Sequence, residues 1–339
     1  MQITSRRLAR EWAVKIIYQQ DVAHTTLDEV LNGAINRLRM EFVVKGSRRA
    51  SGSELEYVVL DVASHLAEPY LPKISEDGIA CFADAAARVP EDAGYWFENR
   101  MERMLKQQLP GVSAQRLFPY RSLSDVLQDR LLSAATAEEQ AYIPVLVDDL
   151  REKCAQVLDA HVRKVARVTA RSWIDKSVAA PVNQAAQVLN SLQTEWMAAQ
   201  MTQFHRAGET VRECLLDYFH TAVYCFSLVR GVDANLAEID AVIKTQTQHW
   251  SMERQAAVDR NILRLACYEL LKEQNAPGIV INEAVELAKK YSTENSGKFI
   301  NGVLGGITAG AKPLEGASIS KEETVIESAA VDSVEIVTP

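Results

Sequence analysis

The sequence predicts an all-α protein, and two observations support this fold class. Apolar residues recur at helical spacing through almost every segment of the 339 residues, whereas no segment has the alternation expected of a strand. The chain also has only 15 glycines and 10 prolines, which disfavours a β protein rich in turns. Because proline is tolerated in a first helical turn but not in a helix interior, we expect helix ends near Pro69, Pro72, Pro90, Pro110, Pro119, Pro144 and Pro181.

The predicted helices fall into three blocks followed by a tail. The first helix is expected at about residues 5–21, with Ser5 as its N-cap, and the second at about residues 27–43. A break rich in Gly, Ser and Arg (Lys45–Ser53) then precedes a proline-punctuated helical region that ends near Gly208. Five more helices are expected at about residues 209–230, 232–247, 252–274, 281–291 and 294–308, the last with Thr293 as its N-cap. The expected units are N-terminal helices (1–45), a helical insertion (46–208), C-terminal helices (209–310) and a tail (311–339).

Composition narrows the class of protein. No apolar run approaches the roughly 18 residues that cross a membrane, and no apolar segment of a secretory signal follows the N-terminus. We therefore expect a cytoplasmic protein that does not engage a membrane. The five cysteines are scattered without a C-x-x-C pair, and the six histidines show no ligand spacing. We expect the cysteines to be small buried apolar residues, and we expect neither a metal nor another cofactor.

The last segment of the chain is strongly acidic. Lys321 is its single cation after Leu314, against the acids Glu315, Glu322, Glu323, Glu327, Asp332 and Glu335. Because the segment lacks aromatic residues and helical periodicity, we expect a disordered acidic tail. Such a tail either increases solubility or competes with nucleic acid for a basic surface.

Arginines gather on one side of the first helix, although the whole chain has a formal net charge of −8. At about 100° per residue, the apolar stripe of this helix consists of Leu8, Ala9, Trp12 and Ile16. The opposite face, which we expect to be exposed, then holds Arg6, Arg7, Arg10, Val14 and Tyr18. Such a face suits phosphate contacts, with the tyrosine available to stack on an unpaired base. A solvated charged face without a ligand is the alternative interpretation.

Four long motifs give the chain a family resemblance. Near the C-terminus these are LVRGVDANLAEIDAVI, AAVDRNILRLACYELL and VINEAVELAKKYSTENSGKFINGVL, and at the N-terminus the motif is RRLAREWAVKIIYQQD. Together they resemble the NusB family of transcription antitermination factors. The resemblance covers about residues 3–45 and 209–308, in the same order along the chain.

The resemblance implies a fold and an activity. It implies a NusB-like helical bundle of two packed subdomains, with residues 46–208 as a large helical insertion, and it implies no catalysis. NusB proteins pair with NusE, a ribosomal protein, and the pair binds single-stranded boxA RNA. The assembly then supports read-through by RNA polymerase, notably in ribosomal RNA operons. By resemblance, Arg6, Arg7 and Arg10 belong to the RNA surface of the family.

Two further groups of candidate residues come from the C-terminal motifs. Helical spacing groups Asn295, Lys298 and Asn301 into a patch that can contact phosphates and base edges near a helix N-terminus. Phe299 either belongs to the core or borders the RNA. In the preceding motif, a polar edge holds Asp259, Arg260 and Asn261. These three residues either contact the protein partner or stabilise the start of their own helix.

The insertion contains a second basic stretch, HVRKVARVTARSWIDK. Arg163, Arg167 and Arg171 recur at every fourth residue and form a stripe with Lys164 beside them. Trp173 lies on another face, with Val162 and Ala166. The stripe is either a second RNA-binding surface or a solvated face above a buried tryptophan.

Two other classes of protein remain as alternatives. A ribosomal RNA cytosine methyltransferase with a NusB-like domain would need a strand followed by a glycine-rich loop, and GVLGGITAG instead has the pattern of a helix end. The second alternative is a protein-interaction scaffold that has lost RNA binding. The three arginines of the first helix favour the RNA-binding interpretation.

Overall fold

The computed structural model describes residues 3–49, 54–108, 136–247, 252–273 and 275–310, and over these residues the protein is all-α with no strand. The prediction of the fold class is therefore confirmed. Among the described helices, none combines the length and the apolar character needed to span a bilayer. The elements are α1 (Ile3–Ala23), α2 (Leu27–Arg49), α3 (Glu54–Ala67), η1 (Glu68–Tyr70), α4 (Glu76–Gln108), α6 (Ala137–Val178), α7 (Val182–Ala234), α8 (Leu236–Gln246), η2 (Met252–Arg254), α9 (Ala257–Leu271), α10 (Pro277–Tyr291) and α11 (Ser296–Gly310).

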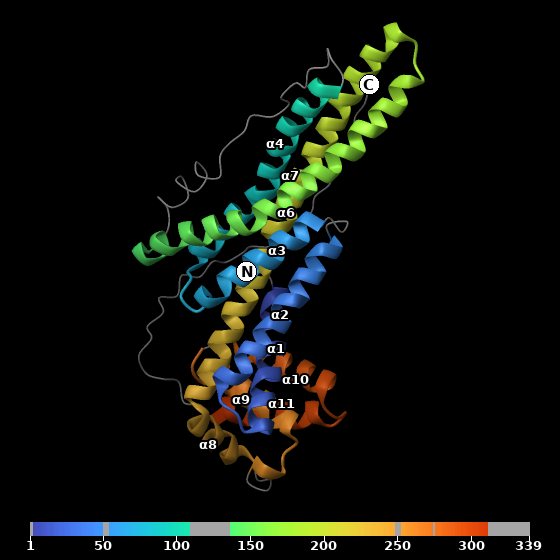
Figure 1. Cartoon of the computed structure of the whole chain (residues 1–339). Helices are drawn as coiled ribbons and strands as arrows, with labels where there is room; N and C mark the ends of the chain where they lie inside the picture. The colour runs from blue at the N-terminus through green and yellow to red at the C-terminus, as the bar shows by residue number, and fades with distance from the viewer. Residues whose placement is uncertain (1–2, 50–53, 109–135, 248–251, 274, 311–339) are drawn as a thin grey trace, which may run out of the picture.

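The long helix α7 organises the molecule. It has 53 residues and is therefore about 80 Å long at the usual rise per residue. Figure 1 shows α4 and α6 beside one half of α7, and α1, α9, α10 and α11 gathered around its other half. Helices α2 and α3 pack against α7 between these two groups. The molecule is consequently elongated along α7.

The apolar core is continuous along α7. Tyr218 and Phe219 are both buried on this helix, with rings 5.5 Å apart. The Tyr218 ring contacts Phe42 of α2 at 5.6 Å, and the Phe219 ring contacts Phe82 of α4 at 5.9 Å between centroids. Residues of the insertion and of the N-terminal helices therefore share one core along the C-terminal half of α7.

The helix end predicted at Gly208 is wrong, because α7 continues through this residue. A glycine inside a helix is destabilising by about 1 kcal/mol relative to alanine. Packing offsets this penalty, since Phe204, Ala207 and Val211 are buried on one face of α7 on both sides of the glycine. The helix is therefore unbroken at the predicted boundary between the insertion and the C-terminal helices.

Several other predicted boundaries also change. Helix α2 extends through Arg49, so most of the Lys45–Ser53 break is helical. Pro90 and Pro144 lie inside α4 and α6 rather than at helix ends. A proline in a helix interior costs about 3 kcal/mol, and the buried residues beside Pro144, such as Ile143, place this turn in the core. Pro181 precedes α7 as its N-cap and Pro69 lies in the first turn of η1, as predicted.

The remaining predictions on local structure have mixed outcomes. Helix α11 begins at Ser296, two residues after the expected start, and its first-turn amides of Lys298 and Phe299 donate to the Asn295 carbonyl. All five cysteines are free and buried, as expected of apolar core residues. Pro110, Pro119 and the acidic segment 311–339 lie outside the described residues.

The insertion has its own aromatic contact between α6 and α7. Trp173 is 3% exposed and packs edge-to-face against Trp196, with ring centroids 5.8 Å apart. Val162 and Ala166 are buried on the same helix, so the predicted apolar face of α6 is confirmed. The basic stripe of Arg163, Lys164, Arg167 and Arg171 is exposed on α6.

We expect Trp173→Ala to lower the free energy of unfolding by about 3–5 kcal/mol, because it leaves a cavity between α6 and α7. Val168→Ala is the matched control, since Val168 lies on α6 and is 66% exposed. Urea denaturation followed by circular dichroism measures both variants. A Trp173→Ala protein as stable as the control would contradict the packing described here.

Candidate nucleic-acid interface

Helix α1 packs against α7, α9 and α2, and this packing decides which of its arginines are exposed. Arg6 and Arg7 are exposed, as predicted from the helical period. The expectation that Arg10 and Val14 share this exposed face is wrong, because they are only 5% and 4% exposed. The apolar face of α1 is therefore wider than the stripe that the sequence indicated.

Arg10 is buried because it pairs with an acid on α9. Its Nη2 donates to Glu269 Oε1 at 2.8 Å and its Nε donates to both carboxylate oxygens at 3.0 Å. The Tyr224 hydroxyl of α7 and the Asn275 amide also donate to Glu269, at 2.8 and 3.1 Å. Burial by itself lowers the pKa of Arg10, but the hydrogen bonds and charge of Glu269 outweigh this effect and raise the pKa. Arg10 thus stays charged and holds α1 in place, with no free guanidinium for RNA.

Arg6 and Arg7 lie at the solvent-exposed start of α1. Arg7 pairs with Glu283 of α10 at 2.9 Å, while its side chain remains 54% exposed. The Arg6 guanidinium lies 5.2 Å from the centroid of the Tyr224 ring. Because the Arg7 side chain remains exposed, it can leave the Glu283 carboxylate and bind a phosphate instead.

The other end of α1 is fixed by a second set of polar contacts. Asp21 accepts hydrogen bonds from Arg260 and Asn261 of α9, at 2.6 and 3.0 Å, and from Arg264 at 2.8 Å. Burial by itself raises the pKa of Asp21, but these donors outweigh it and lower the pKa. The side chain of Arg264 also pairs with Asp240 of α8 at 2.8 Å. These contacts join α1, α8 and α9.

The location of Asp259, Arg260 and Asn261 argues for the internal one of their two predicted roles. Asn261 is fully buried, and Asp259 is 7% exposed and accepts a hydrogen bond from Ser296 Oγ at 2.8 Å. Arg260 uses its guanidinium on Asp21 and on the Met252 carbonyl. The expected polar edge therefore contacts α1, η2 and α11.

Residues of α1 and α10 form a cluster around Glu11. This carboxylate accepts hydrogen bonds from Lys15 at 3.0 Å, from Lys290 at 2.8 Å and from the Tyr291 hydroxyl. Partial burial by itself raises the pKa of Glu11, but the hydrogen bonds from Lys290, Tyr291 and Lys15 outweigh it and bring the pKa to about 2. The cluster places the last turn of α10, with its two lysines, next to the exposed side of α1.

The first turn of α11 adjoins the last turn of α10. A Cβ atom at Gly297 would lie 3.5 Å from Val285 Cγ1 and 3.9 Å from Lys289 Cγ, so the two helices are in close contact there. Asn295, just before α11, and Lys298 and Asn301, on its first two turns, are exposed, as expected of the patch. Phe299 is half-buried and packs against the apolar core, which favours the structural one of its two roles.

The candidate interface consists of exposed and half-buried residues on or directly beside three helices. We call the α1–α10–α11 surface the set formed by Arg6, Arg7, Lys15, Lys289, Lys290, Tyr291, Asn295, Lys298 and Asn301. Four of these residues were not among the candidates predicted from the sequence, namely Lys15, Lys289, Lys290 and Tyr291. The adjacent lysines and tyrosine at the end of the AKKY stretch are the local signal that could have indicated them. Tyr18 is 38% exposed farther along α1.

The α1–α10–α11 surface can bind a polyanion. Lysines, arginines and amides can contact phosphates and base edges, and exposed aromatic rings can stack on unpaired bases. Within the described residues, no group of His, Cys, Asp and Glu is suited to hold a metal ion. Burial raises the pKa of Cys154, Cys225 and Cys267 to about 12, which disfavours their use as nucleophiles.

Comparison with known proteins gives consistent matches. The model of the NusB family matches residues 182–309, which extend from the start of α7 into α11. The match begins inside the region that the sequence assigned to the insertion and leaves residues 3–45 outside. A solved structure of T. maritima NusB is 36% identical and covers 34% of this chain and 78% of that chain, with a TM-score of 0.25.

Curated relatives are similar over part of the chain. Transcription antitermination protein NusB from Thermotoga sp. (strain RQ2) is 51% identical over 88 residues, which cover 26% of this chain. The chain spans 62% of the length of that relative. Transcription antitermination protein NusB from Anaeromyxobacter dehalogenans (strain 2CP-1) is 40% identical over 113 residues, covering 33% of this chain and 75% of the relative.

We expect Arg10→Met to lower the free energy of unfolding by about 3–5 kcal/mol, because it leaves Glu269 buried without a charged partner. Replacing both residues (Arg10→Met with Glu269→Met) should recover most of this loss. Arg6→Met is the control on the same helix, with an expected change below about 1 kcal/mol. Denaturant titration measures all three proteins, and equal losses for the single and double variants would contradict the pairing.

The Glu11 cluster predicts a pH dependence. The pKa of about 2 lies below the ordinary 4.5, so the charge of Glu11 stabilises the fold above pH 4.5, and this contribution is lost as the pH falls toward 2. At pH 7 we expect Glu11→Gln to lower the free energy of unfolding by about 1–3 kcal/mol. The difference from the unmodified protein should shrink below pH 4.5. Glu294→Gln, which removes the charge of an exposed acid before α11, is the control variant in the same denaturant titrations.

Proposed function

Because the chain belongs to the NusB family, we propose that it is a non-enzymatic transcription antitermination factor that binds RNA. Its RNA ligand is a single-stranded boxA-type element in nascent transcripts, bound together with the NusE ribosomal protein. Within the RNA polymerase antitermination complex, the bound pair supports read-through, notably of ribosomal RNA operons. The protein acts in the cytoplasm, where these transcripts are made.

The α1–α10–α11 surface is the observation that supports this proposal. It brings cations from three helices to one side of the molecule, and the acids among them leave much of this charge available. Arg7 is 54% exposed although it pairs with Glu283, and the Lys289 and Lys290 side chains are 61% and 57% exposed. Phosphates can therefore replace Glu283, Glu286 and Glu11 as partners of these cations. Such exchange gives a moderate affinity that depends strongly on salt.

Residues of this surface have different roles in the proposal. Arg6, Arg7 and Lys298 contact phosphates, because each is a flexible cation at the surface. Asn295 and Asn301 provide amide groups that can donate to and accept from base edges. Tyr18 offers a half-exposed ring for stacking. Arg10 does not contact the RNA in this proposal. Its ion pair with Glu269 holds α1 in the orientation from which Arg6 and Arg7 reach the RNA.

The basic stripe on α6 is excluded from the proposed RNA surface. Arg163 pairs with Asp159 one turn earlier on the same helix, which is typical of a solvated charged face. Trp173 faces the interior and cannot stack on a base from this stripe. The stripe nevertheless offers three exposed arginines, which carry the same total charge as Arg6, Arg7 and Lys298, and therefore a charge-matched control.

We expect the triple variant Arg6→Ala, Arg7→Ala and Lys298→Ala to weaken binding of a single-stranded boxA-like RNA. The slope of log affinity against log salt should become shallower by about 0.7 for each lost phosphate contact, or by about 2 in total. Fluorescence anisotropy at several salt concentrations measures both quantities. A scrambled RNA of the same length and composition reports on sequence preference.

The control variant is Arg163→Ala, Arg167→Ala and Arg171→Ala, which removes the same charge from α6. Its affinity and salt slope should match those of the unmodified protein, provided that both variants keep their helicity. Equal effects of the two triple variants would show that net charge and not the α1–α10–α11 surface governs binding. No binding of either RNA by the unmodified protein would favour the scaffold alternative.

A further inference from the structure

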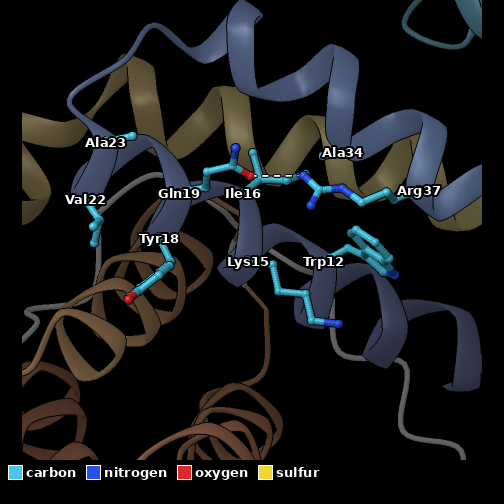
Figure 2. Close-up of a pocket in the computed structure, with 9 residues that line it drawn as sticks. All are labelled: Trp12, Lys15, Ile16, Tyr18, Gln19, Val22, Ala23, Ala34 and Arg37. Atoms are coloured by element: carbon cyan, nitrogen blue, oxygen red, sulfur yellow. Dashed lines mark hydrogen bonds between the residues drawn. The ribbon is translucent and has the colours of Figure 1, made fainter.

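A groove between α1 and α2 opens beside the α1–α10–α11 surface. Its volume is about 370 Å³, which lies within the range of roughly 300–1,000 Å³ typical of sites for small molecules. Figure 2 shows that its walls come from one face of α1 and from Ala34 and Arg37 of α2. Tyr18 and Val22 are 38% and 50% exposed there. The groove is thus an apolar and aromatic recess that solvent reaches.

The deepest aromatic group of the groove is Trp12. Its indole Nε1 donates to Glu41 Oε2 at 3.2 Å, which fixes the edge of the ring. Its face is covered by Lys15, whose Nζ lies 4.7 Å from the ring centroid. Because Lys15 is a long side chain with 40% of its surface exposed, a flat ligand can displace it without moving the backbone.

Lys15 also connects the groove to the neighbouring surface. Its Nζ lies 5.5 Å from the centroid of the Tyr291 ring and 3.0 Å from Glu11 Oε1, so it stands between Trp12 and the end of α10. A strand that lies across Lys290 and Tyr291 therefore reaches the mouth of the groove without crossing other elements. The groove and the α1–α10–α11 surface are continuous.

The polar groups of the groove match a nucleotide. The exposed Arg37 donates from Nη2 to Gln19 Oε1 at 3.1 Å and from Nε to the Gly33 carbonyl at 3.2 Å, which holds its guanidinium at the mouth (Figure 2). Lys15 provides a second cation, and no acid is among the described residues that line the groove. Gln19 adds a carboxamide that can pair with a base edge. This composition favours a phosphate-linked base over an acidic or neutral peptide.

We propose that this groove binds an unpaired base of the RNA strand that the α1–α10–α11 surface holds. The inference rests on the proposed function and extends it by one binding site. The base displaces Lys15, stacks on the face of the Trp12 ring that Lys15 covers and contacts the Gln19 amide. Lys15 and Arg37 then contact the phosphates on either side of the base. RNA that extends past α1 should consequently bind more tightly than RNA that covers only the α1–α10–α11 surface.

The test compares single-stranded RNAs that are lengthened stepwise at either end, measured by fluorescence anisotropy with the full chain. For the unmodified protein, lengthening at one end should increase affinity by about 5-fold or more, as expected for one stacked base. Arg37→Gln should reduce this gain and make the salt slope shallower by about 0.7. Trp12→Leu should abolish the gain. Both variants should bind the short RNA with unchanged affinity.

Arg37→Gln changes an exposed side chain and keeps the proposal testable if Trp12→Leu does not fold, which thermal melting reports. Photo-crosslinking of 5-iodouracil at the added position should map to the peptide that contains Trp12. Equal gains for the unmodified protein and both variants, or crosslinks confined to other helices, would overturn the inference. So would protection of the groove from hydrogen exchange by the NusE partner alone. The triple variant of Arg6, Arg7 and Lys298 tests the proposed function separately. If this variant no longer binds the short RNA, the proposed function stands even where one of these results overturns the groove inference.

Discussion

The ion pair between Arg10 and Glu269 is the contact on which the candidate interface depends. Both side chains are nearly inaccessible, and Tyr224 of α7 also donates to the same carboxylate. A buried pair of this kind is stable only when the remaining polar atoms are hydrogen-bonded. The requirement fixes the rotation of α1 about its axis, because another rotation would bury a charge without its partner. This rotation in turn directs Arg6 and Arg7 to solvent and Glu11 toward α10.

A second set of buried polar contacts fixes the position of α1 along its axis. Asp21 lies about three helical turns beyond Arg10 and binds three side chains of α9. With both ends tied to the same helix, α1 can neither slide nor turn relative to α9. Acids such as Glu11 and Glu283 lower the positive potential of the α1–α10–α11 surface. They also orient the cations with which they pair. A phosphate must compete with them, which makes binding sensitive to salt.

The long helix α7 joins this interface to the insertion. Its C-terminal half packs against α1 and α9, and its N-terminal half packs against α4 and α6. The rings of Phe82 and Phe219 connect the two regions through the core. A helix without a break transmits strain between its ends more readily than a flexible linker does. The insertion is therefore mechanically continuous with the helices that build the candidate interface.

The sequence by itself determined the all-α fold, the apolar stripe of α1 and the buried face of α6 around Trp173, because helical periodicity is a local property. Only the tertiary structure decided the burial of Arg10, since its partner Glu269 is 259 residues away in the chain. The same holds for α7, in which packing around Gly208 outweighs a local signal for a helix end. The lysines of α10 beside α1 also require the fold, because they lie where helices from opposite ends of the sequence meet. The groove at Trp12 requires the packing of α1 against α2.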